Sequence, residues 1–168
     1  MKFVTEEKLQ RMLGNEINVI IKEINAYRTQ KKKHKILYEK DYPAVITAAK
    51  YNQCRKVGRS RSMNALTGNH RNDLHELLKS ALIQAGKELL KRKITIFKFE
   101  EVGKKRYFFG TCAEDDVADK IIKKYESSSH KYKKLQFKNL NEIYFTKARR
   151  PRTWEIIPCC DVCQEIFS

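Results

Sequence analysis

The 168-residue chain has little of what interrupts regular structure, with three prolines and six glycines. It has one tryptophan and no run of the roughly 20 apolar residues that a membrane-spanning helix needs. Its apolar fraction of 41% is too high for a disordered chain, and its charged fraction of 33% is too high for a membrane protein. We therefore expect a soluble, folded chain without a membrane segment.

Cysteine is also scarce, and the five cysteines are an odd number that clusters toward the C-terminus. This pattern does not indicate a disulfide framework, and we expect reduced thiols with a metal site. The first residues reach Glu6 and Glu7 before any apolar stretch forms, so no signal peptide of the usual kind is expected.

Acidic residues are the minority charge, 20 against 36 lysines and arginines, which leaves a net charge of +16. Such a charge attracts polyanions and predicts DNA or RNA as the partner. A lysine-rich, solvated surface from an AT-rich genome explains the same composition about as well.

The segment 131–152 carries eight basic residues and one acid, with aromatic rings between them. Such interleaving is typical of a channel for single strands, although a solvated face is an equal explanation. Lys147, Arg149 and Arg150 are the substrate-binding candidates in this segment. Trp154 could stack on a flipped base or pack in the core, and Asn64 and Asn69 are candidates to hold a sugar hydroxyl.

Hydrophobic spacing predicts alternating helices and strands, and hence an α/β (α+β) chain. We expect an N-terminal segment 1–41, a helix followed by a basic linker, and a domain over 42–168. The predicted elements are a helix capped by Thr5, a strand over 42–49, a strand or basic loop over 53–62, a helix from Asn72 or Asp73 to Leu90, a hairpin over 94–109, a helix from Cys112 capped by Thr111, a strand over 142–147 and a short helix over 158–167 that proline opens.

Two cysteines at the start of that last helix, Cys160 and Cys163, are spaced to place both sulfurs on one side of it. The helix dipole favours their thiolate forms. A third thiol, Cys112, also stands at a predicted helix start and is followed two residues on by Glu114. Three protein ligands with an open fourth position are typical of catalytic zinc.

These motifs resemble the signature of the cytidine-deaminase superfamily, which is His or Cys, then Ala, then Glu, followed later by Pro-Cys-x-x-Cys. The segments 42–45, 57–60 and 110–114 are most similar to the YwqJ-like deaminases, which occur as C-terminal toxin domains of bacterial polymorphic toxins. The resemblance covers about residues 42–168. It implies a three-layer fold with a central mixed sheet flanked by helices. Because the chain ends at Ser168, we expect the sheet to be truncated after the Cys-x-x-Cys helix or completed by the N-terminal part.

The resemblance further makes Cys112, Cys160 and Cys163 the ligands of Zn²⁺ and Glu114 the proton shuttle. The implied reaction is the hydrolytic removal of the amine from cytosine or adenine in DNA or RNA. It also implies a toxin that is made in the bacterial cytoplasm, delivered into a target cell and held in check by an acidic immunity protein.

One departure concerns the second motif, in which Pro158 stands one position early and Cys159 could compete as a ligand. We favour Cys160, because Cys-x-x-Cys places both sulfurs on one helical turn. The alternative to an enzyme is a non-catalytic basic nucleic-acid-binding protein around a structural zinc, with Cys54 or Cys159 as the fourth ligand. The four histidines fit surface or capping positions better than ligand positions.

Overall fold

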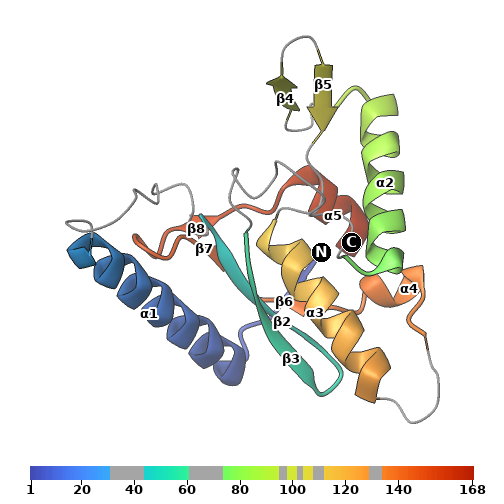
Figure 1. Ribbon diagram of the computed structural model, residues 1–168. Coiled ribbons are helices and arrows are strands. Elements are labelled where there is room, and N and C mark those ends of the chain that lie inside the picture. The colour runs from blue at the N-terminus through green and yellow to red at the C-terminus, as the bar shows by residue number, and fades with distance from the viewer. Residues whose placement is uncertain (31–43, 61–73, 95–97, 102–103, 108–111, 129–133) are drawn as a thin grey trace.

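The computed structural model describes residues 1–30, 44–60, 74–94, 98–101, 104–107, 112–128 and 134–168 (Figure 1). Its elements are, in order, β1 Lys2–Phe3, α1 Glu7–Gln30, β2 Ile46–Tyr51, β3 Cys54–Arg59, α2 Glu76–Lys91, β4 Lys98–Glu101, β5 Lys104–Tyr107, α3 Ala113–Ser128, α4 Phe137–Leu140, β6 Tyr144–Phe145, β7 Ala148–Arg149, β8 Ile156–Ile157 and α5 Asp161–Phe167. The fold is mixed α/β, with a mixed sheet flanked by helices, as the α+β expectation requires. None of the helices in the described ranges is both long and apolar enough to cross a membrane.

Strands β2 and β3 form a hairpin in the main sheet, in which β2 also pairs with β6 and β7. They pair antiparallel from Ile46 opposite Arg59 to Tyr51 opposite Cys54. The tight turn between them places Asn52 at a φ of 51°, a left-handed conformation that asparagine tolerates better than most residues. The basic segment 53–62, for which strand and loop were both open, therefore forms strand β3 over most of its length.

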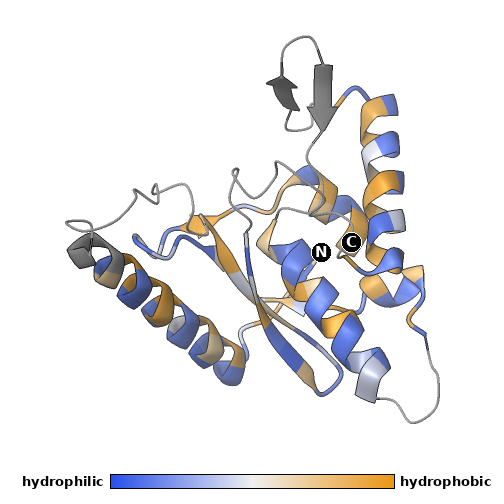
Figure 2. Ribbon diagram, in the orientation of Figure 1, coloured by the Kyte–Doolittle hydropathy of each residue, from blue (hydrophilic) through white to orange (hydrophobic). Residues whose placement is uncertain are grey.

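Helix α1 covers one face of this hairpin. Its apolar side chains recur at three and four residues, and Figure 2 shows hydrophilic and hydrophobic residues alternating along the helix. The buried cluster between the helix and the sheet consists of Leu9, Leu13, Ile17, Ile20, Ile24, Ile46 and Ala48. The predicted N-terminal helix is confirmed, and β1 from the same segment pairs parallel with β6 in the main sheet. The expected boundary between residues 41 and 42 lies outside the described residues.

The other face of the hairpin packs against α3. Successive residues of a strand point to opposite faces, so Ala49 and Tyr51 lie on this face while Ala48 lies on the α1 face. Helices α2 and α5 contact each other and complete this second, larger cluster. Its buried members include Leu78, Leu82 and Leu89 of α2, Val117, Ile121 and Ile122 of α3, and Ile166 and Phe167 of α5.

The strand expected over 142–147 is interrupted. Within that range it forms β6, and β7 follows from Ala148; both pair with β2, and the register shifts by one residue between them. At the shift, Thr146 exchanges hydrogen bonds with Ala48: the N–H of Ala48 donates to Thr146 Oγ1 at 3.0 Å, and the N–H of Thr146 donates to the Ala48 carbonyl at 2.8 Å. The one-residue shift is a β-bulge, and at it a side-chain oxygen takes the place of a backbone carbonyl as acceptor.

Two further expectations are corrected in detail. The predicted hairpin forms β4 and β5, but these strands make a separate two-stranded sheet instead of joining the main one (Figure 1). Helix α2 begins at Glu76, and its N-cap is His75, whose Nδ1 accepts a hydrogen bond from the N–H of Leu77. The predicted cap at Asn72 or Asp73 lies outside the described residues.

Candidate metal centre

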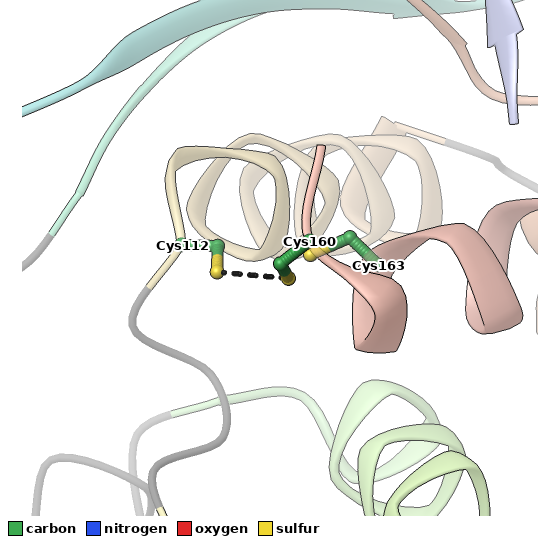
Figure 3. A group of neighbouring side chains, drawn as sticks. All are labelled: Cys112, Cys160 and Cys163. Atoms are coloured by element: carbon green, nitrogen blue, oxygen red, sulfur yellow. Dashed lines mark hydrogen bonds between the residues drawn. The ribbon is translucent and has the colours of Figure 1, made fainter. Parts of the chain in front are cut away.

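The structure brings together three thiols that lie far apart in the sequence. The sulfurs of Cys112, Cys160 and Cys163 all lie within 4.8 Å of one another, and those of Cys112 and Cys160 are 3.5 Å apart (Figure 3). Cys112 directly precedes α3, Cys160 is the N-cap of α5, and Cys163 stands in the first turn of α5. The two helices therefore present their N-terminal ends to the same group of sulfurs.

These sulfurs are close enough to hold a metal ion. Four ligands at the usual zinc–sulfur distance of about 2.3 Å in a tetrahedron place neighbouring sulfurs about 3.8 Å apart. The Cys112–Cys160 separation of 3.5 Å is close to that value, and the other pairs lie within 4.8 Å. In the part of the chain that the structure describes, no other group of His, Cys, Asp or Glu side chains has this geometry.

The three thiols do not share the same protonation. Cys160 accepts hydrogen bonds from the thiols of Cys112 and Cys163, and this lowers the pKa of Cys160 to about 3. The contact with Cys160 raises the pKa of Cys112 well above the usual value, and contacts with Cys112, Cys159 and Cys160 do the same for Cys163, while burial raises both further. These shifts favour the thiolate form at Cys160, which is also the exposed member of the group. The thiolate, and not the thiol, is the form of cysteine that binds metal.

Glu114 follows Cys112 by two residues and is buried in the first turn of α3, with 6% of its surface exposed. Burial raises its pKa to about 7, partly offset by a hydrogen bond from its own backbone N–H, and the charge of Cys160 raises it further. The carboxylate is not a member of the close group of possible ligands. Glu114 therefore lies beside the thiols but outside the group that could bind a metal.

Asp115 is a residue of this site that the sequence did not single out. It is 1% exposed, and its Oδ1 accepts a hydrogen bond from the Cys163 thiol at 3.6 Å. Burial raises its pKa well above the usual range. The sequence does contain a signal for the burial of Asp115. This residue precedes the inward-facing Ala118 and Ile122 by three and seven residues, so all three lie on the same side of the helix. An acid in a first helical turn is usually solvated and favoured by the helix dipole, so the residue type alone does not predict burial beside a thiol.

Two more acids of α3 tie the helix to its neighbours. Asp116 Oδ2 accepts hydrogen bonds from the backbone N–H of Arg59 at 2.9 Å and from Lys120 Nζ at 2.7 Å. Asp119 Oδ1 accepts from the backbone N–H of His75 at 2.6 Å. These contacts anchor α3 to β3 and to the start of α2, and thereby set the position from which Cys112 reaches the other two sulfurs.

Neither alternative ligand belongs to the close group of sulfurs. Cys159 instead donates a weak hydrogen bond to the Cys160 carbonyl at 3.6 Å, although its thiol also reaches that of Cys163. Cys54 begins β3, where burial raises its pKa. The helix expected to open at proline begins instead at Asp161, with Cys160 as its cap, and Cys160 is the residue whose sulfur lies in the close group.

Among the described residues, no contact joins a predicted substrate-binding residue to the three thiols. Trp154 has a φ of 59° and lies over α1, where its Cη2 would be 3.8 Å from a Cβ on Gly14. Arg149 Nη1 donates to the Trp154 carbonyl at 2.8 Å, and Arg150 pairs with Glu155 at 3.1 Å. Lys147 is exposed. Asn64, Asn69 and Thr111 lie outside the described residues.

Comparison of the chain with protein-family models, with curated proteins and with solved structures finds no match in any of the three.

Proposed function

We propose that this chain is a zinc-dependent deaminase that hydrolytically removes the amine from cytosine or adenine in DNA or RNA. The observation that carries the proposal is the convergence of Cys112, Cys160 and Cys163 within 4.8 Å at the starts of two helices, with no fourth thiol in the group. A three-ligand site with an open position is what metal-assisted hydrolysis requires. The Cys-Ala-Glu and Cys-x-x-Cys motifs that supply these residues resemble those of the cytidine-deaminase superfamily.

In this proposal, the three cysteines hold the zinc as thiolates. When bound, zinc supplies an activated water by lowering its pKa. Glu114 takes up a proton on its carboxylate and returns it to the departing amine, so that base and water give the oxo base and ammonia. Once Cys163 has lost its proton, the buried carboxyl of Asp115, whose pKa burial raises well above the usual range, would donate a hydrogen bond to that sulfur and orient it.

The substrate class rests on charge. A net charge of +16 favours a polyanion, and hence a base within a nucleic acid strand, over a free nucleoside. The resemblance to toxin deaminases extends the proposal to a toxin module that is made in a bacterium and delivered into a target cell. An acidic immunity protein would then complement the basic surface.

The experiment is sequencing of single-stranded and double-stranded DNA and RNA after incubation with the zinc-loaded protein. We expect C-to-T or A-to-G changes with the wild type and none above background with Glu114→Gln. The variant keeps its zinc, because Glu114 lies outside the group of ligands. Glu7→Gln is the matched control, since Glu7 is exposed on α1. Absence of any base change with zinc bound, or full activity in Glu114→Gln, would refute the proposal.

A second candidate is a non-catalytic nucleic-acid-binding protein with a structural zinc, and the contact between the Cys159 and Cys163 thiols favours it. X-ray absorption at the zinc edge separates the two. Three sulfurs and one lighter atom support the enzyme, whereas four sulfurs that become three in Cys159→Ser support the structural site.

A further inference from the structure

A cavity of about 570 Å³ lies near the C-terminal end of α3, away from the three cysteines. Its lining residues are Tyr51, Tyr125, Lys134, Leu135, Gln136, Lys138 and Asn139. At 1.5 Å per residue, Tyr125 lies about 18 Å along the helix from Ala113. The cavity is thus distinct from the metal centre, and its volume is in the range of small-molecule sites, about 300–1,000 Å³.

The walls of the cavity are held in place by hydrogen bonds. The backbone N–H of Leu135 donates to Glu126 Oε1 at 3.0 Å, and that of Gln136 donates to Asn139 Oδ1 at 2.9 Å. Glu126 also contacts His75 Nε2 at 3.0 Å, which ties this segment to α2. The site is therefore formed before any ligand arrives, which lowers the entropy lost on binding.

Two aromatic rings form one side of the cavity. The rings of Tyr51 and Tyr125 pack edge to face, with centroids 5.1 Å apart and an interplanar angle of 84°. Tyr51 is 5% exposed, whereas Tyr125 is half-buried, so Tyr125 is the ring that a ligand can reach. An exposed part of a tyrosine ring held rigid by a second ring is a surface on which a base can stack.

The polar lining selects an anion with hydrogen-bonding groups. Among the described lining residues are two exposed lysines, Lys134 and Lys138, and the side-chain amides of Gln136 and Asn139, and none of them carries a carboxylate. The carboxylates of Glu142 and Glu126 lie next to the lining, where they accept hydrogen bonds from Asn139 and from the N–H of Leu135. The adjoining cavity of about 250 Å³ between α2, α4 and α5 is lined by Glu88 and Glu165 and does not fit an anion.

We propose that the cavity beside Tyr125 binds a segment of single-stranded nucleic acid, with a base against the Tyr125 ring and phosphates at Lys134 and Lys138. These lysines belong to the basic, aromatic segment 131–152, which lies between the two cysteine motifs in the sequence. The structure places them at the other end of α3 instead. The site is therefore an anchoring site for a strand, and it does not depend on whether the metal centre is catalytic.

The test is fluorescence anisotropy with labelled single-stranded DNA and RNA octamers, using Lys134→Ala/Lys138→Ala. Two exposed lysines on α1 and α2 supply the control Lys22→Ala/Lys87→Ala, which makes the same change in net charge. We expect at least about tenfold weaker binding in the first variant. The slope of log K against log salt concentration should also be smaller by about 1.4, since each phosphate contact on a single strand contributes about 0.7. The control should change affinity by less than about threefold, and circular dichroism should show both variants folded. Equal weakening in the two variants would overturn the proposal.

A second readout identifies the contact itself. An octamer carrying 5-iodouracil should crosslink under light to the α3 peptide that contains Tyr125, and the crosslink should disappear in Lys134→Ala/Lys138→Ala. Crosslinks confined to other peptides would overturn the proposal, as would displacement of the octamer by thymidine monophosphate at the same nucleotide concentration. Both readouts measure binding at the far end of α3 and not base conversion, so they are independent of the deaminase proposal.

Discussion

Gly58 of β3 lies directly against the first turn of α3. A Cβ atom on Gly58 would lie 2.1 Å from the carbonyl oxygen of Ala113 and 2.6 Å from the amide nitrogen of Val117. Both atoms belong to backbone, which cannot swing aside as a flexible side chain can. Glycine is thus required where strand and helix approach most closely. This approach positions the helix start that carries Cys112 and Glu114.

We predict that Gly58→Ala destabilises the protein, because the added methyl forces α3 away from β3. Overpacking of this kind costs about 1–3 kcal/mol or more in the free energy of unfolding. Urea unfolding followed by circular dichroism measures it. Gly14→Ala is the control, since its Cβ would make an ordinary 3.8 Å contact with Trp154. Alanine within a helix is favoured by about 1 kcal/mol, so that variant should be as stable as the wild type or more so. Equal stability of the two variants would show that the close approach is not rigid.

The hydroxyl of Thr146 should stabilise the bulge between β6 and β7. Thr146→Val keeps the shape of the side chain but leaves the buried N–H of Ala48 without its acceptor. An unsatisfied buried donor costs about 1–3 kcal/mol, and thermal unfolding should show a lower midpoint. Thr146→Ser retains the oxygen and should lose less stability than the valine variant. The reverse order would mean that packing, and not the hydrogen bond, holds the bulge.

The stability of the contact between the start of α1 and the β2–β3 hairpin should depend on pH. Hydrogen bonds from Lys50 and Arg55, both at 2.5 Å, lower the pKa of Glu6 below its usual 4.5. A lowered pKa in the folded state adds stability above pH 4.5 that is lost as the pH falls through the folded value. Glu6→Gln should therefore unfold at lower urea than the wild type at neutral pH, and the difference should shrink as the pH falls below 4.5.

Glu7→Gln is the control for the pH experiment. Its carboxylate is exposed and 4.0 Å from Arg11, so the substitution should change the unfolding midpoint little at either pH. A pH-independent difference between wild type and Glu6→Gln would show that packing, not charge, accounts for the effect of Glu6.

Metal content is the direct test of the three-thiol site. We predict one bound zinc per wild-type chain by mass spectrometry of metals, and loss of that zinc in Cys163→Ser, because a hydroxyl is a far weaker zinc ligand than a thiolate. Cys54→Ser is the control that should retain the metal, since Cys54 is outside the group. Retention of zinc in Cys163→Ser together with loss in Cys54→Ser would contradict this ligand assignment.

Local patterns in the sequence were sufficient for most helices and hairpins. The spacing of Leu9, Leu13 and Ile17 predicted α1, because a helix repeats every 3.6 residues whatever it packs against. The Cys-x-x-Cys and Cys-Ala-Glu spacings likewise predicted which thiols to consider. The bulge at Thr146 could not be predicted, because it depends on a hydroxyl that meets the backbone of Ala48, 98 residues away.

The candidate site likewise has features that local sequence predicts and features that it does not. Cys112, Cys160 and Cys163 lie at helix starts that can be predicted from short-range spacing. Any chain with the same local sequence would share this pattern. The convergence of the sulfurs, the burial of Asp115 beside them and the location of Trp154 over α1 depend on how β3, α3 and α5 pack. Those placements arise from contacts between segments far apart in the chain, and only the tertiary structure decides them, because the energy of such contacts is not encoded in any single local pattern.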